Sequence, residues 1–430
     1  MTGQALDIGS RLETAIAHLE RLVAFPTVSL TSNLDLVDWA SEILSASGAR
    51  LVRTTTPCGT RANIFATLGP EGDDGIVLSG HTDVVPADAA EWSSDPFVLR
   101  QEGDSLHGRG TCDMKGFLAC CLAMVPLFAR QDLTRPLHFA LTHDEEVGCF
   151  GAQDLVTHLE ANGPRPAIAI IGEPTEMGMV DGHKGTHEYT TRFHGRAGHG
   201  SDPDGGANAI HAAALFIAEL LRVGEDLKAR APATSPYTPP WTTVQAGTIN
   251  GGTARNIIAA EAVVEWEMRP ISDADEAFVK ARMADHVDTT LLPLLRWSAL
   301  EYIPEERRHS EERKSGQIKE RGQHQVHAAH QSSRGATIAT EIVAEVRGLV
   351  PTDPNPARDL VANLTGANGA TVVPFGTEAG LFQGLGTAAV VCGPGSIQQA
   401  HTADEFITVD QMRRCLAMLE RLGEHLDASH

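Results

Sequence analysis

The chain has 430 residues, of which 42% are hydrophobic and 21% are charged, fractions typical of an ordinary globular protein. A formal net charge of -22 disfavours nucleic acid and anionic membranes as partners. No apolar run approaches the roughly 18 residues of a membrane span, and we expect no secretory signal at the N-terminus. The 7 cysteines form no C-x-x-C motif, so we expect reduced thiols in a cytoplasmic protein.

The first part of the chain alternates between strand-like and helix-like patterns. Helices are predicted over 11–24, 34–46 and 116–130, and strands over 50–55, 63–68, 75–81, 137–142 and 167–171. The third helix is apolar on every face, which indicates that it is buried. This alternation predicts an α/β fold whose mainly parallel sheet has helices on both faces. Ligand sites in such sheets lie beyond the carboxyl ends of the strands.

After Gly182 the pattern changes. We predict strands over 187–195, 242–248, 257–269 and 340–345, and helices over 207–222, 273–295, 356–364 and 411–426. The order strand, helix, two strands, helix predicts an inserted α+β domain of the ferredoxin-like type. We therefore expect a catalytic domain built from 1–184 and 352–430, with an inserted lid or dimerisation domain over 185–351.

Residues 302–335 depart from these patterns because they are polar and rich in histidine. We interpret them as a disordered loop; the alternatives are a second metal site or a nucleic-acid patch. The stretch is either a true insertion or a local reading-frame error. Either origin affects the edge of the inserted domain and leaves the motifs described next untouched.

Polar motifs follow or border the apolar strand-like runs. They contain His81 and Asp83, Asp113, Glu145 and Glu146, Glu173, and His401. His81 and Asp83 share one face of a strand, so the Asp83 carboxylate can hold one ring nitrogen while the other binds a metal ion. Two zinc-type or cobalt-type ions close together need a shared ligand, which Asp113 can supply. Of the adjacent glutamates, one can bind metal and the other can act as a base.

These motifs, with Gly108-Arg109-Gly110 before Asp113-Met114-Lys115-Gly116 and with Gly172-Glu173-Pro174, resemble the dinuclear-zinc amidohydrolases over nearly the whole chain. That family includes deacetylases of acetylornithine, desuccinylases of diaminopimelate and aminoacylases. The resemblance implies two Zn²⁺ ions, with Co²⁺ as the alternative. It implies that His81, Asp113 and Glu173 bind one ion, and that Asp113, Glu146 and His401 bind the other. It also implies a general base at Glu145, an orienting role for Asp83, and a cis peptide bond between Asp113 and Met114.

The resemblance extends to the inserted domain. His199 resembles the family histidine that reaches the substrate carbonyl, in dimeric members from the partner subunit. Asn256 and Arg269 resemble the groups that hold the substrate carboxylate. We therefore expect a homodimer whose lid closes on a small N-acyl amino acid, with hinges near 183–185 and 349–351.

Within the family, the stretches 373–380 and 393–401 are most similar to members that act on acetylornithine, and Glu378 is expected to suit a cationic side chain. Desuccinylases and general aminoacylases are the alternatives among enzymes. The non-enzymatic alternative is an inactive metal-binding homologue that acts as an interaction module. The retained Glu145 argues against it, since a binding protein needs ligands but no free base.

Overall fold

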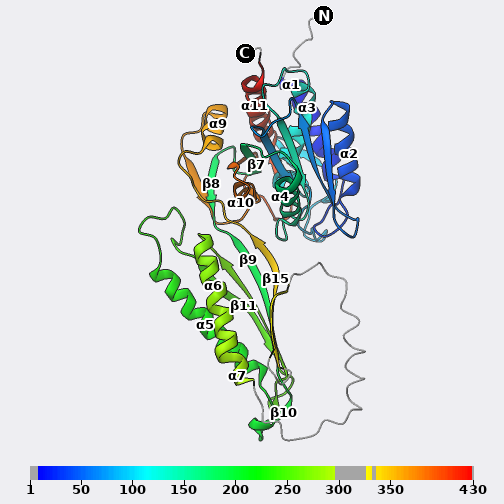
Figure 1. The fold of residues 1–430 in the computed structure, drawn as a ribbon. Helices are drawn as coiled ribbons and strands as arrows, with labels where there is room; N and C mark the ends of the chain where they lie inside the picture. Colours follow the sequence, from blue (N-terminus) through cyan, green and yellow to red (C-terminus); the bar gives the residue numbers. More distant parts are fainter. Residues whose placement is uncertain (1–7, 296–325, 332–335, 429–430) are drawn as a thin grey trace, which may run out of the picture. The chain divides into compact units, whose positions relative to one another are not determined.

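The computed structural model describes residues 8–295, 326–331 and 336–428 (Figure 1). It divides into two compact units. The first is built from Met1–Gly185 and Val346–His430, and the second is the continuous stretch Thr186–Glu345. The second unit is therefore an insertion within the chain that makes the first.

The first unit is organised around a sheet with the strand order β1-β2-β6-β3-β7-β17-β8-β16. Its strands are β1 (Arg50–Thr55), β2 (Ala62–Leu68), β3 (Ile76–His81), β6 (Leu137–Thr142), β7 (Ile168–Pro174), β8 (Met179–His183), β16 (Ala370–Val373) and β17 (Ala388–Gly393). Strands β6, β3, β7 and β17 run parallel to one another in the centre of the sheet. At its edge, β2 pairs antiparallel with both β1 and β6. The predicted mainly parallel α/β sheet is confirmed.

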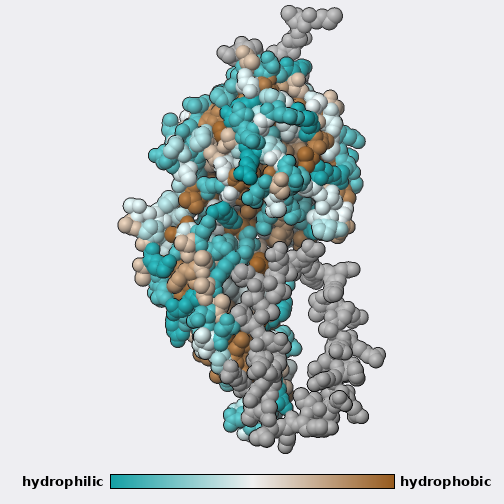
Figure 2. Space-filling view, in the orientation of Figure 1, coloured by the Kyte–Doolittle hydropathy of each residue, from teal (hydrophilic) through white to brown (hydrophobic). Residues whose placement is uncertain are grey.

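Helices cover both faces of this sheet because alternate strand residues point to opposite sides. Ile76 and Leu78 belong to one apolar core together with residues of α1 (Ile8–Val23), α2 (Leu34–Ala46), α3 (Gly116–Phe128), α9 (Pro356–Thr365) and α11 (Val409–Leu426). Val77, between them, packs with α4 (Phe150–Asn162) and α10 (Ala379–Gly384) on the other face. In Figure 2 the visible surface of the first unit is mainly hydrophilic, as expected when most apolar side chains lie inside.

The helix α3 is apolar on all sides, as its sequence indicates. Together with the π-helical turn Thr111–Lys115 it is the one helix among the described residues that is long and apolar enough to cross a membrane, by length and composition alone. Most of its residues are buried inside the first unit, where it packs against α1 and α11. It is thus the core helix that its composition predicts.

The second unit has a five-stranded sheet with the order β11-β13-β9-β15-β14. Its elements are β9 (Thr186–His194), β10 (Gly198–His199), α5 (Ala209–Ala229), β11 (Thr243–Gly251), β12 (Ile257–Ile258), β13 (Glu261–Arg269), α6 (Asp273–His286), α7 (Leu292–Leu294), β14 (Val326–Gln331) and β15 (Thr337–Val346). One apolar core joins the two long helices to the sheet and contains Phe193, Phe216, Trp266 and Met283. The chain order strand, helix, two strands, helix, strand is that of a split βαβ motif.

Two predictions for this unit need correction. The helix predicted over 273–295 is interrupted, because α6 gives way to a π-helical turn over Val287–Leu291 before α7. Most of the predicted disordered loop, 302–335, lies outside the described residues. Within it, however, Val326–Gln331 forms strand β14, which pairs antiparallel with β15. The prediction of a loop is therefore wrong for this segment, whose backbone completes the edge of the sheet.

Candidate metal centre

The predicted ligands meet at the carboxyl end of the central sheet of the first unit. His81 is the last residue of β3, Glu145 and Glu146 follow β6, and Glu173 lies near the end of β7. These three strands are neighbours in the order β6-β3-β7, so their ends share one edge. The turn that opens α3 supplies Asp113, and the loop after β17 supplies His401.

Asp113 lies between two histidines and offers a different oxygen to each. Its Oδ1 is 3.0 Å from His81 Nε2, and its Oδ2 is 3.3 Å from His401 Nε2. Glu173 Oε1 lies 3.7 Å from His81 Nε2 on one side, and Glu146 Oε2 lies 3.0 Å from His401 Nε2 on the other. The result is two groups of one imidazole and one glutamate that share a single aspartate.

The backbone around Asp113 is unusual. The peptide bond between Asp113 and Met114 is cis, as the family resemblance predicts. Gly110 has a φ of 82°, and a Cβ at this position would lie 2.6 Å from Val84 Cγ1 and 3.1 Å from Lys115 Cδ. Only glycine satisfies both the left-handed backbone and the close packing at this point.

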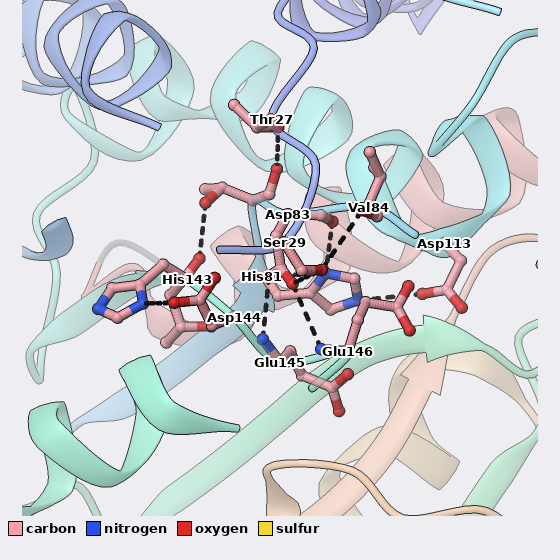
Figure 3. Close-up of polar contacts among 12 residues, drawn as sticks. Thr27, Ser29, His81, Asp83, Val84, Asp113, His143, Asp144, Glu145 and Glu146 are labelled. Atoms are coloured by element: carbon pink, nitrogen blue, oxygen red, sulfur yellow. Dashed lines mark hydrogen bonds and ion pairs between the residues drawn. The ribbon is translucent and has the colours of Figure 1, made fainter. Parts of the chain in front are cut away.

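His81 is held by Asp83, but mainly through the backbone (Figure 3). His81 Nδ1 donates to the carbonyl oxygen of Asp83 over 2.9 Å, whereas the nearer carboxylate oxygen is 3.6 Å away. A carbonyl oxygen only accepts, so Nδ1 carries the hydrogen and Nε2 is the nitrogen available to an ion. The prediction that the Asp83 carboxylate itself orients the ring therefore needs correction, since the main-chain oxygen makes the closer contact.

The Asp83 carboxylate instead holds the backbone of the two adjacent glutamates. It accepts from Glu145 N over 3.0 Å, from Glu146 N over 3.3 Å and from Ser29 Oγ over 2.8 Å (Figure 3). This fixes the irregular turn after β6 from which both glutamate side chains project. Cys149 Sγ donates to Glu145 Oε1 over 3.4 Å. Asp83 therefore positions the turn that carries both glutamates as well as the imidazole.

The centre is rich in buried negative charge. Burial, followed by the charge of Asp113, raises the pKa of Glu173 well above its usual range and that of Glu146 to about 7. Burial also raises the pKa of Glu145. Hydrogen bonds to Asp113 and Glu146 raise the pKa of His401 to about 10. A bound cation would offset the burial and mutual repulsion of these carboxylates and so favour their ionised forms.

The residues present fit divalent metal ions. Atoms of His81, Asp113 and Glu146 lie within 4.8 Å of one another, and so do atoms of His81, Glu145 and Glu173. Glu173 Oε1 is buried and has no hydrogen-bond partner, so this oxygen can accept a cation. Imidazole and carboxylate are ligands of zinc and cobalt. Since Glu145 also meets these distances, geometry alone permits it either a ligand role or a free base role.

The predicted substrate groups of the second unit lie in two separate places. His199 and Asn256 are exposed neighbours, because β10 pairs with β12 and Gly200 N donates to the Asn256 carbonyl over 2.8 Å. Arg269 lies at the other end of β13, where its guanidinium donates to Thr186 Oγ1 over 2.6 Å and pairs with Glu267. Strand β13 spans Glu261–Arg269, which at about 3.4 Å per residue separates these places by about 27 Å.

Glu378 is fully buried rather than displayed to a ligand. Its carboxylate accepts hydrogen bonds from Ser79 Oγ and, over 2.8 Å, from Thr142 Oγ1, so both oxygens are used inside the sheet. Burial raises the pKa of this carboxyl. The geometry gives no support to the predicted contact with a cationic substrate side chain.

Three residues of the centre were missed in the sequence: Ser29, Cys149 and Glu405. Ser29 sits in a loop far from any motif and reaches Asp83 only through the fold. Glu405 is part of a motif around His401, but nothing in its spacing indicates a role. Its carboxylate accepts from Asp113 N over 3.0 Å.

Comparisons with known proteins show which sequences and folds the chain resembles. The sequence profile of Peptidase family M20/M25/M40 matches residues 77–425. An acetylornithine deacetylase from Myxococcus xanthus is 35% identical over 416 residues, which cover 95% of this chain and 96% of that protein. An acetylornithine deacetylase from Proteus mirabilis (strain HI4320) is 32% identical over 407 residues, which cover 92% of each.

Solved structures share the fold. The aminopeptidase PepT from Bacillus cereus superposes with a TM-score of 0.66 at 16% identity, covering 96% of this chain and 98% of that one. The YXEP protein of Bacillus subtilis, described as a dinuclear metal binding peptidase from the M20 family, has a TM-score of 0.61 at 15% identity and covers 97% and 99%. At such identities the likeness concerns the fold alone.

Proposed function

The chain belongs to peptidase family M20/M25/M40, a family of metal-dependent amide hydrolases, and from this membership we propose that it removes the acetyl group from N2-acetyl-L-ornithine to give L-ornithine and acetate. The observation that carries the proposal is the pair of histidine–glutamate groups that share Asp113. The curated relatives supply the choice of acyl amino acid. In a cell this reaction would serve arginine biosynthesis in the cytoplasm.

We assign the metal ligands from the contacts of the centre. His81, Asp113 and Glu173 would hold one Zn²⁺, and Asp113, Glu146 and His401 the other, with Co²⁺ as the alternative ion. Bound divalent ions act as Lewis acids and lower the pKa of water towards neutrality. Asp113 can serve both because each of its oxygens faces a different histidine. Asp83 keeps the His81 ring in one tautomer through its carbonyl.

Glu145 is assigned as the general base. Its carboxylate would take a proton from the attacking water and deliver it to the amine nitrogen as the acetyl C–N bond breaks. Burial raises its pKa, which suits a group that must hold a proton during the reaction. Asp83 fixes its backbone and Cys149 contacts its Oε1, so the side chain is held without needing to bind metal.

The second unit would supply substrate contacts as a lid in a homodimer. One small substrate cannot touch both Arg269 and the His199–Asn256 pair of a single copy, because about 27 Å separates them along β13. We therefore assign the two places to two copies of the chain, so that His199 of one copy serves a substrate whose carboxylate is held by Arg269 of another. Free Arg269 pairs with Glu267, and substrate would compete for that contact.

The hinges of the lid would be the two chain crossings. His183 N donates to Leu349 O over 3.0 Å, so the crossings lie side by side in the first unit. A Cβ at Gly348 would lie 2.7 Å from Gly185 N, so the two crossing segments of the chain approach each other closely. Two adjacent crossings allow one bending axis, as hinge closure requires.

The test is acetate release from N2-acetyl-L-ornithine by protein loaded with zinc or with cobalt, before and after chelation. N-succinyl-diaminopimelate and a panel of N-acyl amino acids separate the desuccinylase and aminoacylase alternatives. A protein that binds the ions but hydrolyses none of these amides would instead be the metal-binding interaction module. Mixing two inactive variants, one altered at His199 and one at Glu145, tests the shared site, because heterodimers would regain one intact centre.

A further inference from the structure

Glu405 is a buried carboxylate whose two oxygens are both occupied by one turn of the chain. Its Oε1 accepts from the backbone N–H groups of Cys112 over 2.8 Å and Asp113 over 3.0 Å. Its Oε2 accepts from Gly110 N and from Arg109 Nη1, both over 2.8 Å. The four donors span the turn that ends at Asp113. Only 1% of Glu405 is exposed, so water does not replace these contacts.

Arg109 balances the charge of Glu405 and anchors it. The guanidinium is buried, lies over the Trp92 ring at 5.1 Å from its centroid, and donates to the Pro86 carbonyl over 3.4 Å. A buried ion pair of this kind is weak evidence for stability, because an apolar pair of similar volume often serves stability equally well. Three of the four contacts are to backbone amides, which set the shape of a turn. The arrangement therefore favours a role in geometry.

The backbone of Glu405 belongs to the segment that carries His401. Gly108 N donates to the Glu405 carbonyl over 2.9 Å. The next residues form β18 (Phe406–Thr408), which pairs with β5 (Ser105–His107). The same loop is held upstream, where Cys112 Sγ donates to the Ser396 carbonyl over 3.2 Å. Glu405 and Cys112 thus join the loop of His401 to the turn of Asp113 on both sides of the histidine.

We propose that Glu405 is a positioning residue that fixes Asp113 relative to His401, and so sets the geometry of the ion that these two residues share. The inference rests on the proposed metal centre. The carboxylate and Arg109 are 296 positions apart in the chain, so the contact forms only when the two loops dock. Without it the Asp113 backbone amide loses its acceptor, and the turn is free to move its carboxylate away from His401.

The decisive variant is Glu405→Gln. Glutamine has the size of glutamate, but its NH₂ group can only donate and would face backbone or guanidinium donors. At least one of the four hydrogen bonds would therefore be lost. Glu219→Gln is the matched control. Glu219 is also buried and accepts from two arginines, Arg222 and Arg282, each over 2.7 Å, but it lies in the second unit. Arg109→Lys is the milder second variant, since it keeps the charge and the backbone contacts of Glu405.

The measurements are zinc affinity by chelator competition, the visible absorption spectrum of the cobalt-loaded protein, and kcat and KM. We expect Glu405→Gln to bind the ion shared by Asp113 and His401 about 10–100-fold less tightly, the range for partners that orient metal ligands. We also expect an altered cobalt spectrum and a lower kcat with a smaller change in KM. Glu219→Gln should match the parent, and Arg109→Lys should fall between.

Folded Glu405→Gln with the parent's zinc affinity and cobalt spectrum would overturn the inference and leave the metal centre standing. If Glu405→Gln fails to fold, Glu405→Asp decides by the same two measurements, because its shorter side chain cannot reach all four donors, and parental values there would also overturn the inference. A parent protein that binds no zinc or cobalt would overturn the proposed function, and this inference with it.

Discussion

His401 Nε2 lies 3.3 Å from Asp113 Oδ2, so a residue from the loop between β17 and β18 meets one from the turn that opens the core helix α3. The other oxygen of Asp113 faces His81 at 3.0 Å. A carboxylate placed in this way between two imidazoles is poised to bridge two ions.

Asp113→Ala should reduce the number of tightly bound ions from two to at most one. Both imidazoles lose their common partner, so turnover should fall by more than the roughly 10–100-fold that loss of an outer partner costs. Metal content by elemental analysis and initial rates give the answer. Asp285→Ala, an exposed aspartate on α6, serves as the control. Two tightly bound ions in Asp113→Ala would remove the bridging assignment.

Glu145→Gln should keep both ions and lose hydrolysis. The amide fills the same space but cannot accept the proton, and loss of a general base costs about 10²–10⁴-fold in turnover. Metal analysis beside single-turnover kinetics separates binding from chemistry. Glu160→Gln, an exposed glutamate on α4, should behave as the parent. Loss of an ion in Glu145→Gln would make this residue a ligand, the other role that its distances permit.

His199→Ala should lower turnover by about 10²–10³-fold without changing metal content, because one donor to a developing oxyanion is worth that much. His211→Ala, an exposed histidine on α5 of the same unit, should have little effect. A mixture of His199→Ala and Glu145→Gln subunits should recover activity that neither homodimer has. If turnover of His199→Ala stays within a few-fold of the parent, His199 has no catalytic part and the lid serves substrate binding alone.

Glu378→Gln should affect stability and leave substrate binding alone. The carboxyl is buried under the sheet and held by Ser79 and Thr142, so its replacement should change the free energy of unfolding by about 1 kcal/mol. KM for N2-acetyl-L-ornithine should stay within about two-fold of the parent. Urea denaturation and steady-state kinetics measure the two quantities. A large rise in KM would restore the predicted contact with the cationic side chain.

Acid should weaken the fold through His138. Burial, with a smaller contribution from Arg50, lowers the pKa of this histidine from 6.5 to about 4. Between about pH 4 and pH 6.5 the unfolded chain therefore binds a proton on His138 that the folded chain does not bind. The free energy of unfolding falls as the pH is lowered from 6.5 towards 4. At about 1.36 kcal/mol per pKa unit the full difference is about 3 kcal/mol.

The measurement is the free energy of unfolding at pH 7.5 and pH 5 in the parent and in His138→Gln. His138 lies in β6, where it stacks on Phe65 and contacts Thr67, away from the metal ligands. Any loss of metal in acid should therefore affect both proteins equally. The variant should lose less stability between the two pH values than the parent does, and equal losses would contradict the prediction.

Some elements could be predicted to the residue and others could not. The bounds of α2 and β6 agree with the sequence pattern because their apolar residues recur at helical spacing or form a short unbroken run. Strand β8 was missed since it contains Asp181 and Gly182, which are poor strand formers. Helix α4 was missed because it begins after Cys149, in a left-handed conformation, without a capping side chain.

The candidate site also has features that the sequence predicts and features that it does not. The positions of His81 and Glu173 at strand ends, and of Asp113 before the core helix, are local properties, so the sequence predicts them. The hydrogen bonds of the Asp83 carboxylate and the burial of Glu378 depend on segments distant in the chain. Periodicity carries no information about such contacts, and only the assembled fold reveals them.

The insertion of the second unit fixes the order in which the centre is completed during synthesis on the ribosome. Strand β17, which lies between β7 and β8, and the last ligand, His401, both follow Thr186–Glu345 in the chain. The second unit can therefore fold while the first still waits for a central strand. His81, Asp113 and Glu173, the proposed ligands of one ion, are made early, so the proposed assignment would give a nascent chain one ligand set long before the other is complete. Chains released before His401 would sequester metal without gaining activity.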